Sequence, residues 1–261
     1  MLVMASRSRA PDGTIDCHVH IGRWPLLGLA FSLEDLDQVM KQYHYAGAVV
    51  IPPLQNRDDP IGSNLELQRQ IHGRDDLLFF PWVHVGAAAD SEASMLEYLE
   101  RNLDAIDGVK FHASISQIGI ADKRLRAVLG FLDRHGLPLL YHCGRHPISS
   151  AAPVKEIADS YPGVKFILAH LGGNAYDLVV DTMKMLNPGA PENVFLDTST
   201  ARHPALLRKA IETYGEGKII FGTDLPFTEM NMNWACLEFA RLTNNVKILG
   251  GNLRRILRKP S

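Results

Sequence analysis

The chain has 261 residues, of which 46% are hydrophobic and 21% are charged, and its formal net charge is −2. This is the composition of a globular protein that can bury its own core, and the near-neutral charge excludes binding to nucleic acid or to an anionic membrane through a general electrostatic field. Three cysteines without a CxxC pair make no disulfide framework, so we expect reduced thiols in a cytoplasmic protein.

Residues 1–12 are predicted to form a flexible N-terminal arm, because their apolar start is far too short for a signal sequence. Residues 13–261 contain no linker and no low-complexity segment, so they are predicted to form a single domain. No apolar segment approaches the roughly 18 residues that are needed to cross a bilayer.

Eight short apolar runs, rich in Val, Ile, Leu and Phe, recur along this domain, and their starts are 24 to 34 residues apart. Runs of this kind are typical of strands that are buried on both faces of a parallel sheet. The eight predicted strands are 14–20, 48–52, 78–85, 108–112, 137–142, 165–170, 194–198 and 218–223.

Amphipathic stretches between the strands have helical periodicity. The predicted helices are 32–45, 92–103, 123–135, 152–160, 175–186 and 204–214. Eight strand–helix units in a row predict an α/β fold, a single-domain (β/α)8 TIM barrel. A doubly wound open sheet is the alternative, but its usual GxGxxG fingerprint is absent and eight units exceed its usual count.

In such a barrel, function resides at the C-terminal ends of the strands. The first predicted strand ends in Asp16-Cys17-His18-Val19-His20. Because side chains alternate along a strand, we expect Asp16, His18 and His20 on one face, and Cys17 and Val19 on the face toward the helices.

Several later strands end in polar side chains of the same kinds. These are Lys110 and His112 on the fourth strand, His142 on the fifth, His170 on the sixth and Asp224 after the eighth. One isolated histidine is most simply a hydrogen-bonded residue of the barrel mouth, but histidine at four of eight strand ends exceeds its background. Imidazoles and one carboxylate that converge on an axis suit Zn²⁺, with Mn²⁺, Fe²⁺ or Co²⁺ as alternatives.

The motifs in this order resemble the amidohydrolase superfamily of metal-dependent barrel enzymes, and within it the amidohydrolase-2 branch of hydrolases, lactonases and decarboxylases of the aminocarboxymuconate-semialdehyde type. The resemblance runs from about Ile15 to the C-terminus. The motifs are IDCHVHIG at 15–22, GVKFHAS at 108–114, LPLLYHCG at 137–144, KFILAHLGG at 165–173, NVFLDTST at 193–200, KIIFGTDLPF at 218–227 and ILGGNLRRIL at 248–257.

The resemblance implies one divalent metal, most simply zinc, held by His18, His20, His142 and Asp224. His170 would be a further ligand or an acid/base group beside the metal. Lys110 stands on the strand where two-metal members of the superfamily carry a carbamylated lysine. The alternative for Lys110 is a lysine that closes a barrel layer by pairing with Asp16 or Asp197.

By the same resemblance, the expected activity is hydrolysis of an amide, ester or lactone bond in a small, carboxylate-bearing substrate. The metal would activate a water, Asp224 would be the general base, and His170 would polarise the carbonyl or assist proton transfer. The first alternative is a metal-dependent decarboxylase of a small unsaturated or aromatic acid. The second is a barrel that binds a small molecule without turnover.

Four residues are candidates for substrate binding: Arg145, His112, Lys110 and Trp24. Arg145 on the fifth loop has the geometry to bind a carboxylate as a fork, and its alternative is an ordinary surface charge. The alternative for Trp24 is a lid that packs on the barrel rim. Beyond a small-molecule substrate, the only partner expected is a second copy of the chain, on the base rate of homodimers.

Overall fold

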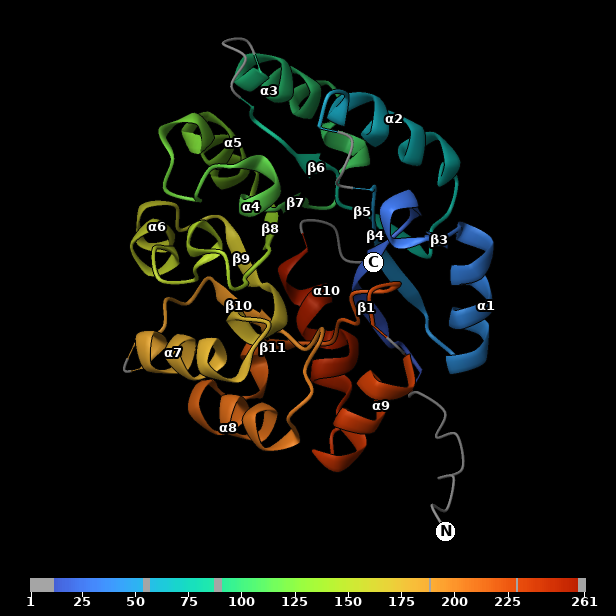
Figure 1. Cartoon of the computed structure of the whole chain (residues 1–261), viewed down its shortest axis with the longest axis vertical. Coiled ribbons are helices and arrows are strands. Elements are labelled where there is room, and N and C mark those ends of the chain that lie inside the picture. Colours follow the sequence, from blue (N-terminus) through green and yellow to red (C-terminus); the bar gives the residue numbers. More distant parts are fainter. Residues whose placement is uncertain (1–11, 54–56, 87–90, 188, 229, 258–261) are drawn as a thin grey trace.

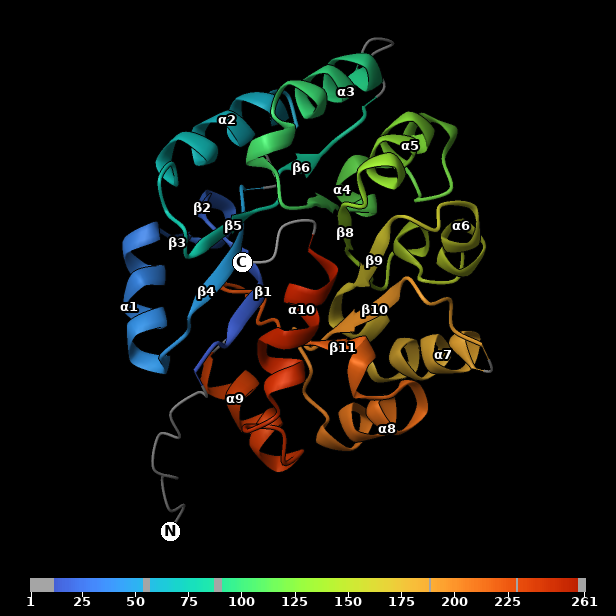
Figure 2. The same ribbon diagram turned by 180° about the vertical axis from the view of Figure 1, so that it is seen from behind.

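The computed structural model describes residues 12–53, 57–86, 91–187, 189–228 and 230–257. The predicted arm, apart from Asp12, therefore lies outside the described residues. Figure 1 shows a central ring of strands surrounded by helices, and Figure 2 shows the same ring from behind. The predicted (β/α)8 barrel is confirmed. No helix in the described ranges is long and apolar enough to span a membrane.

The barrel strands of the described ranges are short and buried. They are β1 (Ile15–His20), β4 (Gly47–Ile51), β5 (Leu77–Phe79), β6 (Trp82–Val83), β7 (Val109–Phe111), β8 (Pro138–Tyr141), β9 (Lys165–Leu168), β10 (Val194–Asp197) and β11 (Ile219–Ile220). A small hairpin, β2 (Gly22–Trp24) and β3 (Leu29–Phe31), follows β1 outside the ring.

Helices surround the ring, and the last of them, α10 (Asn252–Ile256), closes one end of the barrel. They are α1 (Leu33–Tyr43), α2 (Pro60–Gln70), α3 (Ser91–Arg101), α4 (Ala113–Ser116), α5 (Arg126–His135), α6 (Val154–Ser160), α7 (Tyr176–Leu186), α8 (Pro204–Tyr214), α9 (Met230–Phe239) and α10 (Asn252–Ile256). The six predicted helices correspond to α1, α3, α5, α6, α7 and α8. Helices α2, α4, α9 and α10 were not predicted, although Asp59 caps α2 by accepting a hydrogen bond from the Gly62 N–H.

The third predicted strand, 78–85, is divided in the structure into β5 and β6. β5 pairs in parallel with β4, and β6 pairs in parallel with β7. The break contains Pro81, which has no N–H to donate to a strand ladder. The two short strands together occupy one position in the ring, so the barrel still has eight strand positions within the described ranges.

The ring closes between β11 and β1 through individual hydrogen bonds. The Cys17 N–H donates to the Phe221 carbonyl at 3.0 Å, and the Asp224 N–H donates to the His18 carbonyl at 2.8 Å. The His20 N–H donates to the Leu225 carbonyl at 2.7 Å. Closure therefore places the end of β1 directly beside the loop that follows β11.

A bulge in β1 changes the expected pattern of side chains. Asp16 pairs with Ala48 of β4, whereas Val19 pairs with Val50, so three steps along β1 face two steps along β4. Cys17 consequently packs with Ile15 among the residues inside the barrel, not toward the helices as predicted. Val19 packs with the outer core, as predicted. The extra residue of the bulge shifts the inward and outward alternation of the side chains by one position, which does not occur in a regular strand.

The lower half of the barrel interior, at the N-terminal ends of the strands, is apolar. We call it the lower layer; it consists of Ile15, Val49, Leu78, Leu140, Ile167, Phe195 and Ile220, and it contacts Leu253, Ile256 and Leu257 at the C-terminus. Helix α10, which carries Leu253 and Ile256, lies across the centre of the ring in both views. The upper half of the interior holds the polar residues described next.

Candidate metal centre

The bulge brings the two imidazoles of the HxH motif to the upper end of the barrel. The His18 and His20 Nε2 atoms lie 3.2 Å apart, and the two residues are 0% and 3% exposed. Gly222 gives His18 its space, because a Cβ at this glycine would lie 3.1 Å from the His18 Cβ and 2.9 Å from the Cys17 Sγ. A larger residue at 222 would require the side chains of Cys17 and His18 to shift.

Asp224 supplies a carboxylate to this pair. Its backbone is left-handed, with φ of 65°, and its N–H is bonded to the His18 carbonyl. Its Oδ1 atom lies 3.2 Å from His18 Nε2 and 3.4 Å from His20 Nε2. Ligands bound about 2.0–2.2 Å from a tetrahedral metal lie roughly 3.3–3.6 Å from one another. The separations among these three atoms therefore fit one divalent metal.

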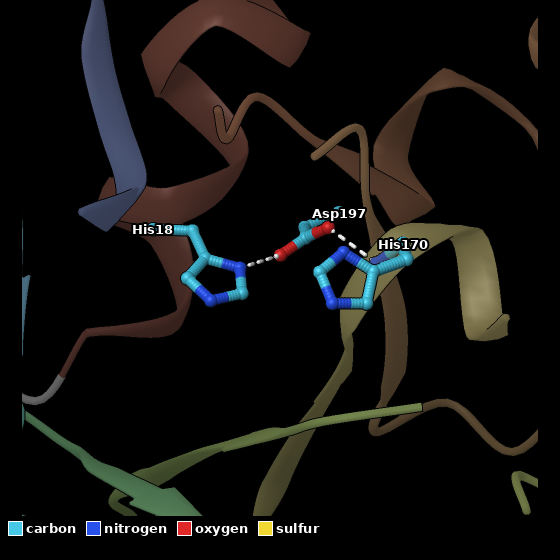
Figure 3. Close-up of side chains that lie close together, drawn as sticks. All are labelled: His18, His170 and Asp197. Carbon is cyan, nitrogen blue, oxygen red and sulfur yellow. Dashed lines mark hydrogen bonds and ion pairs between the residues drawn. The ribbon is translucent and has the colours of Figure 1, made fainter. Parts of the chain in front are cut away.

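Asp197, at the end of β10, holds the other side of the His18 ring (Figure 3). Its Oδ2 atom accepts a hydrogen bond from His18 Nδ1 at 2.8 Å. With its proton on Nδ1, the neutral His18 ring has a lone pair on Nε2, which is the form that binds a metal. His18, His170 and Asp197 also have ligand atoms within 4.8 Å of one another, but the contacts of Asp197 are those of a carboxylate that supports the rings.

Lys110 of β7 is fully buried in the same cluster. Its Nζ atom donates a hydrogen bond to His18 Nε2 at 2.8 Å, so the predicted pairing with Asp16 or Asp197 is not its direct contact. Burial lowers the pKa of Lys110 to about 8, against the opposing effect of Asp224 and Asp197. The ammonium uses the lone pair that a metal would take, so this hydrogen bond and a metal on His18 exclude each other.

His142 and His170 complete the upper cluster, which we define as His18, His20, Lys110, His142, His170, Asp197 and Asp224. His142 Nδ1 lies 3.2 Å from His170 Nε2. Among the described residues, two groups have ligand atoms that all lie within 4.8 Å of one another: His18, His20 and Asp224, and His18, His170 and Asp197. His170 belongs to the second group, and His142 belongs to neither. The structure therefore brings His142 next to His170 rather than into the group of His18, His20 and Asp224.

Burial sets the proton affinities in the cluster. It raises the pKa of Asp224 to about 6 and lowers the pKa of His170 below its usual value. It lowers the pKa values of His18, His20 and His142 well below the usual range, with the nearby Lys110 charge adding to the effect. Neutral imidazoles and one carboxylate that titrates close to neutral pH are a suitable donor set for a divalent metal.

His112 and Trp24 lie close to the cluster. The His112 ring stacks on His142 with centroids 3.7 Å apart, and His112 Nδ1 accepts a hydrogen bond from the Ile115 N–H at the start of α4. Trp24 is 6% exposed and packs edge-on against Phe227. The Phe227 ring in turn contacts the His20 ring, with the two ring centroids 5.5 Å apart. Trp24 is thus linked to His20 through the ring of Phe227, which was not among the predicted site residues.

Arg145 is not brought to the cluster. Its side chain is 70% exposed and forms an ion pair with Asp177 at 3.3 Å. A role of Arg145 in substrate binding stays a prediction.

Asp16 and Ser199 were not predicted to support the cluster. Asp16 accepts hydrogen bonds from the His18 N–H, the Thr223 N–H and the Thr223 hydroxyl, and so ties β1 to the loop that carries Asp224. Burial raises the pKa of Asp16 to about 7. Ser199 lies between Asp197 and His170. The only signal in the sequence was their position in the IDCHVHIG and NVFLDTST motifs, which does not reveal these contacts.

The sequence matches one known protein family. A family model described as amidohydrolase, of the amidohydrolase-2 type, matches residues 15–259. Among curated proteins, the sequence has no significant match.

Solved structures share the fold. The 5-carboxyvanillate decarboxylase from Sphingomonas paucimobilis superposes with a TM-score of 0.70 at 15% identity, over 94% of this chain and 98% of that one. A dihydroxybenzoic acid decarboxylase from Polaromonas, with bound manganese and 2-nitroresorcinol, gives 0.69 at 16% identity, over 94% and 97%. An amidohydrolase from Burkholderia multivorans with bound HEPES gives 0.73 at 14% identity, over 93% and 98%. Identities this low establish the fold alone.

Proposed function

This chain belongs to the amidohydrolase-2 family of metal-dependent enzymes, and on that premise we propose that it is a carboxy-lyase that removes CO₂ from a small unsaturated or aromatic acid. The observation that carries the proposal is the fully buried cation of Lys110 in the upper cluster, whose hydrogen bond to His18 Nε2 a bound metal would replace. With a divalent metal, the centre would carry three positive charges against the two carboxylates of Asp197 and Asp224. Such a site attracts an anionic substrate.

The metal proposed here is a single divalent ion on His18, His20 and Asp224, and we propose His142, whose Nδ1 faces His170 in this structure, as the fourth ligand. Zinc suits this set of imidazoles and carboxylate, and manganese is the alternative, as in the Polaromonas decarboxylase. When bound, the ion would supply a Lewis acid that holds the oxygen atoms of the substrate.

The protein's own groups would move the proton. In decarboxylation the bond between the carboxylate carbon and its neighbour breaks, its electron pair stays on the neighbouring carbon, and that carbon takes a proton. Asp224 is the first candidate for this transfer, because its carboxylate lies beside the two ligand nitrogens of His18 and His20. Among the described residues, its Oδ2 atom accepts no hydrogen bond and is therefore available for this transfer. His170 is the second candidate for the acid/base role.

Two named relatives favour decarboxylation, because the Sphingomonas and Polaromonas structures are described as decarboxylases of aromatic acids. Hydrolysis of a small amide, ester or lactone is the second candidate. It is favoured by the same pair of Asp224 and His170, which could take the proton of an attacking water.

The test is a substrate panel on protein loaded with zinc or manganese. Hydroxybenzoates and short dienoic acids are followed by CO₂ release, and lactones, esters and amides are followed by acid production. We expect CO₂ release that stops after chelation and returns with the metal. Metal-dependent acid production without CO₂ would establish the hydrolase instead.

The remaining expectations are proposals of the same kind. All three cysteines are buried and unpaired, which suits a reducing compartment, and we propose a cytoplasmic location. Homodimerisation stays a prediction from base rates.

A further inference from the structure

A chain of hydrogen bonds joins a metal-ligand candidate to an acid/base candidate. His18 Nδ1 donates to Asp197 Oδ2 at 2.8 Å. The other oxygen of Asp197 accepts from the Ser199 hydroxyl, the Ser199 N–H and the His170 N–H. The Ser199 Oγ atom lies 2.8 Å from His170 Nδ1. Figure 3 shows Asp197 between the two rings, with its dashed lines to His18 and His170.

The direction of each hydrogen bond follows from the number of protons available. Four donors converge on the Asp197 carboxylate, which can only accept while it is ionised. The single hydroxyl proton of Ser199 is directed to Asp197, so Ser199 has only lone pairs to offer His170. His170 Nδ1 must then carry the proton, and the lone pair of the neutral ring is on Nε2.

We propose that Ser199 is a positioning residue that fixes the neutral His170 ring as its Nδ1–H tautomer. The Nε2 lone pair is thereby turned into the upper cluster, where it lies 3.2 Å from His142 Nδ1. This inference rests on the proposed function only in giving His170 an acid/base role. The tautomer itself does not depend on any reaction.

The backbone around His170 keeps the ring in this place. His170 and Leu171 both have left-handed backbones, with φ of 62° and 56°, a conformation that is uncommon outside glycine. The His170 N–H is bonded to the same Asp197 oxygen that accepts the Ser199 proton. The main chain and the ring of His170 are thus aligned to one carboxylate, and Ser199 is 0% exposed, so water does not compete for these bonds.

Nuclear magnetic resonance of protein labelled with ¹⁵N-histidine tests the tautomer. Two-bond correlations distinguish a protonated ring nitrogen from an unprotonated one, and a His170→Gln variant identifies the His170 signals by their loss. We expect Nδ1–H in the native protein, a substantial Nε2–H population in Ser199→Ala, and a return to Nδ1–H in Ser199→Thr, which keeps a hydroxyl.

Thr198→Val is the matched control. Thr198 is a buried hydroxyl residue of the same loop, but its Oγ1 is bonded to the carbonyl and N–H of Gly222 and not to His170. We expect this variant to keep the native tautomer. Nε2–H in the native protein, or Nδ1–H in Ser199→Ala, would overturn the proposal.

Kinetics give a second readout on the metal-loaded enzyme. With the wrong tautomer, Ser199→Ala should lower kcat on the order of 10- to 100-fold, less than the roughly 10²- to 10⁴-fold of a fully lost acid/base group, and leave KM nearly unchanged. A tautomer change in protein that turns over no substrate would support Ser199 and contradict the proposed function. If the tautomer is unchanged in Ser199→Ala while activity still requires His170, the role of Ser199 is contradicted and the proposed function is supported.

Discussion

The lower layer and the upper cluster of the barrel interior are built by the same strands, two residues apart. Leu140 faces the lower layer, and His142 follows it in the upper cluster; Phe195 and Asp197 repeat this on β10. The lower layer buries apolar side chains against α10, and the upper cluster buries charged groups and imidazoles. The start of each of these strands therefore contributes to stability, and its end contributes polar side chains to the candidate site, as expected for this barrel.

The largest effect should follow from Asp224→Asn. The amide can still offer an oxygen to a metal, but it cannot take up or release a proton, so we expect turnover to fall by at least the roughly 10²- to 10⁴-fold of a lost acid/base group. Steady-state kinetics and metal analysis measure both properties. A kcat close to that of the native enzyme would remove Asp224 from the proton transfer.

His142→Ala and His170→Ala should divide the upper cluster. We expect His142→Ala to lose metal, whereas His170→Ala keeps most metal and loses kcat by about 10²- to 10⁴-fold. Metal content and kcat are measured together on both variants. Equal metal loss in both would make His170 a ligand and would favour a second metal near Lys110.

Leu140→Ala tests the lower layer on the strand that also carries His142. Leu140 is 0% exposed, and removing a buried leucine side chain costs about 2–5 kcal/mol of unfolding free energy. Urea denaturation measures this loss, and we expect metal affinity to be unchanged. The comparison between the two halves fails if Leu140→Ala weakens metal binding as much as His142→Ala.

Lys110→Met should strengthen metal binding by roughly tenfold, because it removes a positive charge that lies about one hydrogen bond from a ligand nitrogen. Calorimetric titration with zinc measures the affinity. Weaker binding would show that Lys110 contributes to holding the metal, as a modified lysine would.

Metal affinity should depend on pH through Asp224. The pKa of this carboxyl is about 6, so it is ionised above that pH and takes up a proton below it, whereas the imidazoles stay neutral. We expect affinity to fall about tenfold for each pH unit below 6, since ligands bind deprotonated. Asp224→Asn should abolish this slope, and a slope that persists would assign the proton to another group.

The sequence predicted the eight strand positions and most of the polar strand ends, because buried apolar runs and their last residues are local properties. The predicted side of Cys17 was wrong, because a bulge depends on pairing with a strand that is distant along the chain. The prediction of one strand over 78–85 did not take account of Pro81, which cannot donate to a strand ladder and lies at the break. The sequence analysis also placed Arg145 near the site, although a long side chain on a loop follows whatever partner is close, here Asp177.

The contacts of Ser199 and Asp16 could not be predicted for the same reason. Each links segments that are distant along the chain: Ser199 joins β10 to the loop after β9, and Asp16 joins β1 to Thr223. The strand ends reveal which residue types gather at the barrel mouth, but not which nitrogen faces which oxygen.

The bulge in β1 has a consequence for how such a centre can arise. A regular strand with the pairing of Ile15 and Asp16 would turn His18 and His20 outward, into the packing against the helices. One additional residue brings both rings inward and leaves the lower layer apolar. In genetic terms, the step between a strand that turns both imidazoles outward and one that presents them to the barrel interior is a single codon, inserted or deleted in frame.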